Sequence, residues 1–211
     1  MKVQILIDNI NSFYIPYAYK LKDKLKENID SVSIIHNHSD VVEGDILCLI
    51  GCEKLFKYLN LNKSNIVVHE SWLPKGKGWS PLSWQVIEGE SEIPVTLFEA
   101  GNDIDTGKIY LQECIKLLGN ELNDELKHKQ GLLTNSLIEK YILSYPNIKG
   151  KEQQGKSTFY KRRTPKDSEL NINKSIDEQF NLLRIVDNQN YPAYFIKNNV
   201  KYILKIEKDN G

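Results

Sequence analysis

The chain has 211 residues, of which 40% are hydrophobic and 27% are charged, and its formal net charge is zero. This length suits one good-sized domain with a small appendage. The balanced charge argues against a nucleic-acid partner, because proteins that bind nucleic acids usually carry a basic surplus. The N-terminus lacks a signal-peptide pattern and no apolar run approaches about 18 residues, so we expect a cytoplasmic protein with no membrane partner.

Two groups of residues have spacings that could suggest a metal site. Cys48 and Cys52 stand four residues apart, but no second cysteine pair accompanies them, and Cys48 lies in an apolar run that is typical of a buried thiol. His36 and His38 have metal-like spacing but no third ligand, which favours a solvated strand end. The sequence therefore predicts no metal.

Short apolar runs alternate with longer amphipathic stretches through the first 150 residues. The runs predict strands at 3–7, 32–35, 46–50, 66–68, 95–98 and 108–111. The stretches predict helices at 12–26, 53–59, 112–127 and 132–143, the last two separated by a break near Gly131. This alternation is typical of an α/β fold with a mostly parallel sheet that is covered on both faces.

The last third of the chain has a different character. Residues 149–166 are polar and basic, which favours an exposed connection, with a phosphate-binding patch as the alternative. A helix is predicted at 175–186, followed by a β-hairpin whose strands, 193–196 and 202–206, flank Asn198-Asn199. We therefore divide the chain into a catalytic domain, residues 1–150, and a small C-terminal extension with a helix and a hairpin, residues 151–211.

Candidate chemistry is concentrated between residues 65 and 107. His69 directly follows an apolar strand, at the sheet edge where ligands of α/β proteins bind. A loop rich in glycine and proline follows at 73–81, and an acidic loop with Asp105 lies between two later strands. We expect the two side chains on neighbouring strand ends. A carboxylate can orient an imidazole and stabilise its protonated form, so they are candidates for an acid–base pair. The alternatives are a structural histidine and an aspartate that only shapes a turn.

Several ordered motifs resemble one enzyme family. His69-Glu70-Ser71-x-Leu73-Pro74, Gly78-x-x-Pro81, Gly89-Glu90, Val95-Thr96 and Asp105-x-Gly107 resemble the folate-dependent formyltransferases in order and spacing. The tail, with Pro165-x-Asp167-Ser168-x-Leu170 and Arg184-x-x-Asp187-Asn188-x-x-Tyr191-Pro192-Ala193, is similar to that of the sugar N-formyltransferases. The start, Asp8-Asn9-x-Asn11-Ser12-Phe13, and the loop at 73–81 most resemble the branch that acts on pseudaminic-acid-type precursors.

The resemblance implies a Rossmann-like formyltransferase fold and a defined reaction. A formyl group would pass from 10-formyltetrahydrofolate to the amine of a small-molecule acceptor, a nucleotide-linked amino-dideoxy sugar, with His69 and Asp105 as the catalytic residues. Folate would be bound by Gly51, Cys52, Ala100, Gly101, Asn102, Ile104 and Asp105. The acceptor would be bound by Asp8, Asn9, Asn11, Ser12, Phe13, Lys75, Lys77, Gly78 and Trp79, and the run Lys161-Arg162-Arg163 offers further cations for a diphosphate.

Some of these assignments have alternatives. Gly51-Cys52 could form a plain turn from strand to helix, and Trp79 and Trp84 are expected to pack rather than to stack on a ligand. A methionyl-tRNA formyltransferase matches the motif, but we expect a large RNA-binding domain there. A formyltetrahydrofolate hydrolase and a folate- or nucleotide-binding protein without turnover complete the alternatives.

One position departs from the family pattern. The family usually has an asparagine two residues before the histidine, where its amide contacts the formyl oxygen, and this chain has Val67. Asn65 lies four residues before His69, which is ~13 Å along an extended strand and too far to replace that amide. Asn102, His69 itself, a backbone amide or water would have to supply the contact, or the enzyme is slow.

Overall fold

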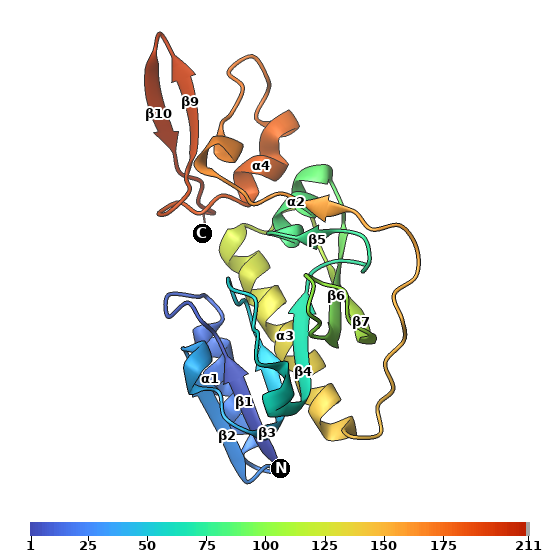
Figure 1. Ribbon diagram of the computed structural model, residues 1–211. Coiled ribbons are helices and arrows are strands. Elements are labelled where there is room, and N and C mark those ends of the chain that lie inside the picture. The colour runs from blue at the N-terminus through green and yellow to red at the C-terminus, as the bar shows by residue number, and fades with distance from the viewer. Residues whose placement is uncertain (210–211) are drawn as a thin grey trace.

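The computed structural model describes residues 1–209 and contains one six-stranded sheet, of order β2-β1-β3-β4-β6-β7 (Figure 1). Strands β1 (Lys2–Leu6), β2 (Ser31–Ile35), β3 (Gly44–Leu49) and β4 (Asn62–His69) are parallel to their neighbours. Strands β6 (Glu92–Glu99) and β7 (Ile109–Lys116) pair antiparallel at one edge. The predicted α/β fold with a mostly parallel sheet is confirmed.

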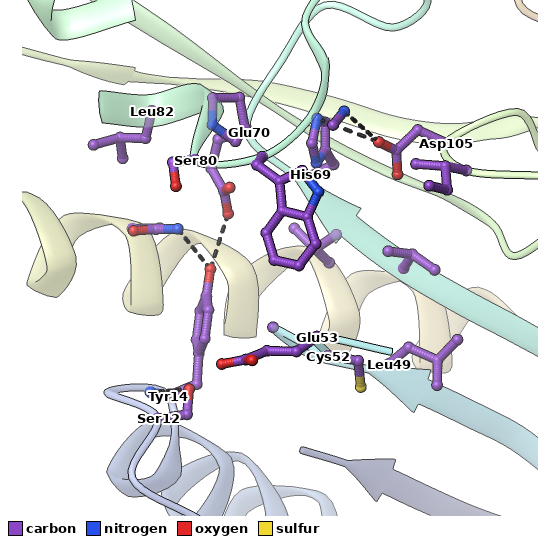
Figure 2. A pocket seen from close by; sticks show the side chains of 18 of the residues that line it. Ser12, Tyr14, Leu49, Cys52, Glu53, His69, Glu70, Ser80, Leu82 and Asp105 are labelled. Atoms are coloured by element: carbon purple, nitrogen blue, oxygen red, sulfur yellow. Dashed lines mark hydrogen bonds and ion pairs between the residues drawn. The ribbon is translucent and has the colours of Figure 1, made fainter. Parts of the chain in front are cut away.

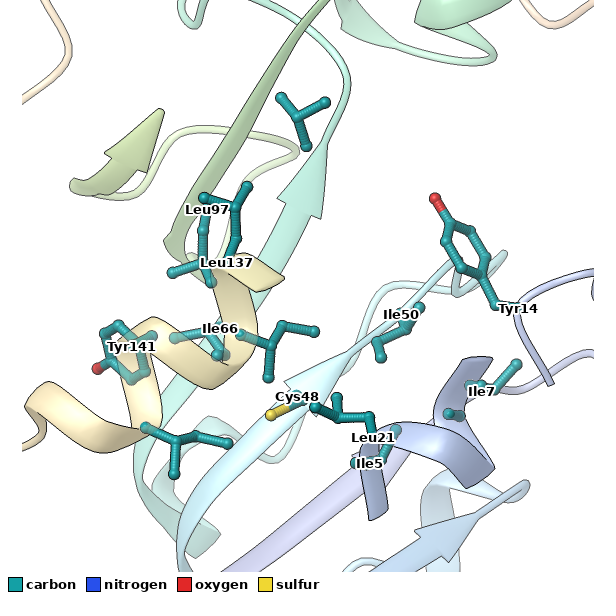
Figure 3. Packing of buried hydrophobic residues seen from close by; sticks show 14 of the residues in the cluster. Ile5, Ile7, Tyr14, Leu21, Cys48, Ile50, Ile66, Leu97, Leu137 and Tyr141 are labelled. Atoms are coloured by element: carbon teal, nitrogen blue, oxygen red, sulfur yellow. The ribbon is translucent and has the colours of Figure 1, made fainter. Parts of the chain in front are cut away.

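Two helices cover one face of this sheet. The helices α1 (Ile15–Leu25) and α3 (Asn123–Ser144) contact each other; α1 packs on β2, and α3 packs on β6 and β7. Alternate residues of the strands, such as Ile5 and Cys48, meet Leu21 and Leu137 in a single apolar cluster (Figure 3). Burial of these side chains drives the docking of the helices.

The opposite face is covered by loops rather than by a helix. Leu6, Leu47 and Leu49 meet Phe56 there. The predicted helix at 53–59 is wrong: the segment is irregular and ends in a 3₁₀ turn, η2 (Leu59–Leu61). The backbone N–H groups of Glu53 and Lys54 donate to the Asp8 carboxylate, at 2.8 and 3.0 Å, which holds the start of the segment against the loop after β1. Another 3₁₀ turn, η1 (His38–Asp40), lies in the loop after β2.

The helices predicted at 112–127 and 132–143 also require correction. Residues 112–116 belong to β7, and α3 starts at Asn123 and runs through Gly131 without a break. A Cβ atom at Gly131 would lie 2.7 Å from the Tyr17 ring. The glycine therefore lets α3 approach α1 closely, and this contact, rather than a helix end, explains its presence.

The segment after β4 contains two short elements that carry the active-site loop. β5 (Lys77–Gly78) is followed by the helix α2 (Pro81–Glu88), which the sequence analysis did not predict. Pro81 starts the helix and Gly89, with φ +90°, ends it, as is usual for these two residues. β5 pairs with β8 (Phe159–Tyr160), which belongs to the connection at 149–166. Most residues of this connection are exposed, as predicted.

The C-terminal extension packs on the end of the sheet beside α2 (Figure 1). It contains the 3₁₀ turns η3 (Pro165–Ser168) and η4 (Asp177–Gln179), the helix α4 (Phe180–Arg184), and the strands β9 (Ala193–Lys197) and β10 (Val200–Leu204). The hairpin is confirmed, and Asn198 and Asn199 have the positive φ angles that tight hairpin turns require. Helix α4 is shorter than the predicted 175–186. Residues 210–211 of the predicted extension lie outside the described part.

The extension has its own apolar cluster, but it also joins the main core. Leu170, Leu183, Val186 and Ala193 pack together, whereas the neighbouring Ile185 belongs to the cluster between α3 and the sheet. The buried Arg184 pairs with Glu121 at 3.4 Å. The extension is therefore docked rather than tethered. Within residues 1–209, no helix has the length and apolar character that a membrane crossing requires.

Candidate active site

A cavity of about 530 Å³ opens beside the last residues of β4 (Figure 2). Its wall combines the loop before α1, the loop after β3, the end of β4, the start of α2, the loop after β6 and the first turns of α3. Ligand sites of small molecules usually have a volume of this order. Most of the candidate residues from the sequence converge on this cavity.

His69 is the last residue of β4 and is almost fully buried in the cavity wall. Its Nε2 atom lies 2.8 Å from the carbonyl oxygen of Gly76 and 3.7 Å from Oδ2 of Asp105. A carbonyl oxygen only accepts hydrogen bonds, so Nε2 carries the hydrogen and donates it. In the neutral ring, Nδ1 then keeps its lone pair and is available as a base.

Asp105 is held by hydrogen bonds to its side chain and to its backbone. Its Oδ2 atom accepts a hydrogen bond from the Gly78 backbone N–H at 2.9 Å, and the side chain amide of Gln153 donates to the carbonyl oxygens of Asp105 and Gly107, both at 2.9 Å. Asp105 itself has φ +54°, an uncommon backbone angle for a residue with a side chain. A Cβ atom at Gly107 would lie 1.8 Å from the carbonyl oxygen of Glu99, so only glycine fits there.

The route by which Asp105 reaches His69 differs from the prediction. From the sequence, the two residues were expected on neighbouring strand ends. However, β6 runs antiparallel to β4, so its last residue, Glu99, lies beside Ile66 in the middle of β4. The loop at 100–107 therefore folds back toward His69 instead of starting next to it. Because the loop folds back, Gly107 lies against the Glu99 backbone, and the Gln153 amide reaches the loop carbonyl oxygens.

A second polar group in the cavity wall was not predicted. Glu70 is buried, and its Oε1 atom accepts a hydrogen bond from the Tyr14 hydroxyl at 2.9 Å. Gln130 of α3 in turn donates to the Tyr14 oxygen at 2.7 Å, and Gln85 donates to the Glu70 backbone carbonyl oxygen. Burial, followed by the neighbouring carboxylate, raises the pKa of Tyr14 well above its usual value. The signal for Glu70 was its place in the matched motif, directly after His69.

The next feature is the position of Val67, where the family usually has an asparagine, and of the two nearest candidates to replace it, Asn65 and Asn102. Val67 lines the cavity, and its side chain carries no hydrogen-bond donor. Asn65 lies away from the cavity wall and donates through Nδ2 to the carbonyl oxygen of Leu59 at 2.8 Å. Asn102 is exposed and is not part of the lining. Neither asparagine therefore supplies an amide at the Val67 position.

Most of the predicted folate-binding residues belong to the wall of this cavity, and Cys52 and Ala100 pack with Leu49 in one apolar cluster. Gly51, Cys52, Ala100, Gly101, Ile104 and Asp105 all line the cavity, together with the apolar side chains of Leu49 and Phe98. Gly51 is followed by an irregular loop and not by a helix. The Cys52 thiol donates to the carbonyl oxygen of Leu6 at 3.3 Å, and burial raises its pKa to about 12, so it is a poor nucleophile.

The predicted acceptor-binding residues divide into two groups. Ser12, Phe13, Gly78 and Trp79 line the cavity, whereas Asp8, Asn9, Asn11, Lys75 and Lys77 do not. Asp8 is occupied by backbone N–H groups and by His38, whose Nε2 lies 3.1 Å away, and Lys77 is buried within the β5–β8 pair. Lys54 and Lys127 line the cavity and were not predicted.

A cation contacts an aromatic residue of the cavity wall. The Arg162 guanidinium lies 4.5 Å from the centre of the Trp79 ring and 3.6 Å from a carboxylate oxygen of Glu53. Trp84 instead packs against Tyr160 away from the lining, as expected for that residue. The basic connection thus contributes one cation, Arg162, that is in contact with a residue of the cavity wall.

Comparison with known proteins identifies the family. A family model described as formyl transferase matches residues 7–138. The methionyl-tRNA formyltransferase of Mycoplasma mycoides subsp. mycoides SC is 29% identical over 167 residues, which are 77% of this chain and 52% of that protein. The chain therefore spans about half the length of the curated relatives it matches.

Solved structures share the fold. A methionyl-tRNA formyltransferase from Clostridium thermocellum superposes with a TM-score of 0.82 at 19% identity, covering 100% of this chain and 95% of that chain. WlaRD, a sugar 3N-formyl transferase determined in the presence of dTDP and 5-N-formyl-THF, superposes with a TM-score of 0.71 at 23% identity, covering 95% and 84%. Because the family model spans well over half of the sequence, the chain belongs to the formyl transferase family.

Proposed function

We propose that this protein transfers the formyl group of 10-formyltetrahydrofolate to the amine of a nucleotide-linked amino-dideoxy sugar of the pseudaminic-acid type. One observation carries the proposal: a buried histidine whose Nε2 is occupied by Gly76 and Asp105, and whose Nδ1 remains a base in the wall of a cavity. Residues 1–150 form the catalytic domain in this proposal, and the rest of the chain is the extension docked on it.

The predicted folate-binding part of the cavity wall supports the proposed donor. A pterin is a flat heteroaromatic ring, and Leu49, Phe98 and Ile104 give the wall apolar surfaces of the kind such a ring requires. Gly101 and the loop backbone around it would offer main-chain hydrogen-bonding groups to that ring. When bound, the donor supplies an electrophilic formyl carbon, and the residues of this chain bind and orient it beside His69.

The chemistry of the chain's own residues follows from the hydrogen bonds. His69 accepts a proton from the attacking amine at Nδ1 and becomes charged on the ring. Asp105, at 3.7 Å from Nε2, stabilises that charge and keeps the ring oriented. Because Val67 offers no donor at its position, the protonated His69 would also stabilise negative charge on the formyl oxygen.

The acceptor side supports a nucleotide-linked sugar. Phe13 and Trp79 offer aromatic surface, and Lys54 and Lys127 line the same cavity with Arg162 against Trp79. A diphosphate needs cations or N–H donors for its charge, and a nucleobase needs an apolar or aromatic surface. The neutral net charge of the chain favours such a small acceptor over tRNA.

A second candidate rests on Val67. Without an amide at this position the protein could bind folate and nucleotide with no transfer to an amine, or transfer the formyl group to water. Release of formate in the absence of any amine would support the hydrolase.

Mass spectrometry distinguishes these functions directly. The protein is incubated with 10-formyltetrahydrofolate and with UDP-linked amino-dideoxy sugars, methionyl-tRNA or glycinamide ribonucleotide at equal concentrations, and the products are examined for the gain of one carbonyl. We expect gain on the nucleotide sugar and its loss in His69→Gln. Preference for methionyl-tRNA or glycinamide ribonucleotide would contradict the proposed acceptor, and formylation of the free sugar alone would reject only the nucleotide.

A further inference from the structure

We propose that Glu70 binds the amine of the acceptor and removes its first proton, as a second acid–base group beside His69. This inference rests on the proposed function and adds a residue role to it. It is carried by the position of a buried carboxylate in the cavity wall, one residue beyond His69 in the chain.

Glu70 is held in one orientation by a chain of hydrogen bonds, of which Tyr14 and Gln130 also line the cavity. The Tyr14 hydroxyl donates to Oε1 at 2.9 Å, and Gln130 fixes the Tyr14 oxygen at 2.7 Å. The backbone carbonyl oxygen of Glu70 accepts from Gln85 at 2.5 Å. These contacts come from three different elements, so the side chain is fixed in position before any ligand arrives.

The second carboxylate oxygen has no such partner. Within residues 1–209, Oε2 of Glu70 accepts no hydrogen bond and takes part in no ion pair. It is not one of the buried side-chain atoms that lack a partner, so it remains accessible in the cavity that Glu70 lines. The open oxygen belongs to a residue of the cavity wall, and a ligand with N–H groups or positive charge would satisfy it.

The position of Glu70 assigns it to the acceptor rather than to the folate. In Figure 2, Glu70 lies on the side of Ser80 and Leu82 and its carboxylate points toward Tyr14, whereas Asp105 lies across His69 from it. His69 thus lies between Glu70 and the Asp105 loop, which holds most of the predicted folate-binding residues. An amine bound at Glu70 would reach His69 from the side away from that loop.

The proton balance of the transfer requires two proton acceptors. An amino sugar in neutral solution is largely an ammonium ion, R–NH₃⁺, which has no lone pair for attack. Glu70 takes one proton and leaves a neutral amine; the amine nitrogen then bonds to the formyl carbon, and the bond between that carbon and the folate nitrogen breaks. His69 takes the second amine proton and passes it to the leaving nitrogen, while Glu70 releases its proton to solvent.

Other ionisable groups in the cavity are placed differently. Tyr14 lies against Glu70 and donates to it, and its raised pKa keeps it protonated. Lys127 is on α3, 3.2 Å from Asp187, and Glu53 is in contact with Arg162. Lys54, Asp103 and Asp105 line the same cavity from the loops after β3 and β6. These groups are the same in wild type and in Glu70→Gln, so their titration cancels when the two proteins are compared at each pH.

The test is the pH dependence of kcat/KM for the nucleotide-linked amino sugar in wild type and Glu70→Gln. Glutamine keeps the size of the side chain and an oxygen for Tyr14, but it takes up no proton. At neutral pH we expect a loss of roughly 100-fold, within the range for a positioned base. The variant must draw on the neutral amine already present, so its defect should shrink by about tenfold per pH unit as the pH rises toward the amine pKa.

Matched controls separate this role from a structural one. Glu88 is also paired with a tyrosine hydroxyl, that of Tyr160 at 2.6 Å, but it lies outside the cavity wall, so Glu88→Gln should retain wild-type activity. An acceptor analogue with a hydroxyl in place of the amine should bind wild type and Glu70→Gln equally. The amine substrate should bind Glu70→Gln more weakly.

The outcomes are distinct. Wild-type kcat/KM in Glu70→Gln at every pH, or a loss that does not change with pH, would overturn the role of Glu70 and leave the proposed function intact. A wild-type protein that formylates no nucleotide-linked amino sugar would overturn both. If Glu70→Gln does not fold, Glu70→Asp replaces it: the shorter carboxylate should lower kcat/KM without introducing the steep pH dependence, and full activity would contradict the proposal.

Discussion

Asp105 and His69 are linked through a loop as well as directly. Oδ2 of Asp105 lies 3.7 Å from Nε2 of His69 and accepts a hydrogen bond from the N–H of Gly78, and the same nitrogen of His69 contacts the carbonyl oxygen of Gly76. The loop at 73–81 thus provides a hydrogen-bond acceptor for the imidazole and a donor for the carboxylate. A movement of this loop would change the orientation of both side chains together.

This arrangement predicts the behaviour of two active-site variants. His69→Gln should reduce formyl transfer roughly 100- to 10,000-fold, because it removes the base, and should leave the affinity for folate largely unchanged. Asp105→Asn should reduce kcat in the same direction because an amide does not stabilise a charged imidazole. Steady-state kinetics with saturating substrates and a folate-binding titration check both. Near-wild-type turnover by His69→Gln would remove His69 from the mechanism.

Val67 allows the opposite kind of prediction, a gain of activity. Its side chain lines the cavity two residues before His69, so Val67→Asn places an amide donor where the formyl oxygen would lie. Removing one hydrogen-bond donor to such an oxygen typically lowers the kcat of an enzyme roughly 100- to 1,000-fold. Adding a donor should therefore raise kcat. Val67→Thr, with a shorter polar side chain, is the control. An unchanged or lower kcat in a folded Val67→Asn protein would show that another group already makes this contact.

Gly107 should be intolerant of any side chain. A Cβ atom there would lie 1.8 Å from the carbonyl oxygen of Glu99, so Gly107→Ala must displace the backbone of the loop that carries Asp105. We expect a loss of stability of about 1–3 kcal/mol, together with lower activity. Gly119→Ala is the control: its Cβ meets nothing within 4 Å, so it carries only the strain of φ +90°, about 1–2 kcal/mol. Denaturant unfolding and activity of both variants are the measurements, and full activity in Gly107→Ala would contradict the expectation.

Glu121 should make stability depend on pH. Burial alone would raise its pKa, but the hydrogen bonds from Lys129 and from the Leu118 backbone outweigh burial and lower the pKa to about 2. A carboxyl group with a lowered pKa in the folded state stabilises the protein above its unfolded pKa, near 4.5, and this stabilisation is lost as the pH falls toward about 2.

The measurement is the free energy of unfolding between about pH 6 and about pH 2, a range that includes the unfolded and folded pKa values of Glu121. Glu121→Gln should be less stable than wild type near neutral pH and should lose less stability on acidification. Glu113→Gln, which removes an exposed pair with Lys140, should follow the wild-type curve. Parallel curves for Glu121→Gln and wild type would disprove the assigned role.

The sequence predicted the elements whose pattern is local. The strands up to β4 are short apolar runs, and the hairpin at Asn198-Asn199 has a recognisable turn. The prediction of a helix at 112–127 was wrong because the charged residues Glu113 and Lys116 of an edge strand are spaced three residues apart, which also suits a helix. Gly131 was taken for a helix break, although its role is a contact with Tyr17 of another helix.

The site shows the same division. His69 and Asp105 were found through a motif, and the structure brings them together. The Glu70–Tyr14–Gln130 chain was not found, because Tyr14 lies 56 residues before Glu70 and 116 before Gln130. Local patterns carry no information on which distant polar residues meet. Likewise, Asp8 has the right composition for a binding loop but uses its carboxylate to hold the backbone after β3.

The contacts of Gln153 have a consequence for synthesis. The segment after α3 supplies the amide that holds Asp105 and Gly107, and a strand that pairs beside Gly78. During synthesis on the ribosome, the residues that line the cavity are therefore made before Gln153 and β8, which hold the Asp105 loop and pair with β5. A nascent chain that ends near residue 150 would contain His69 and Asp105 but would lack the clamp on the Asp105 loop. Binding competence should thus arrive late, with the emergence of a connection whose composition gives no hint of it.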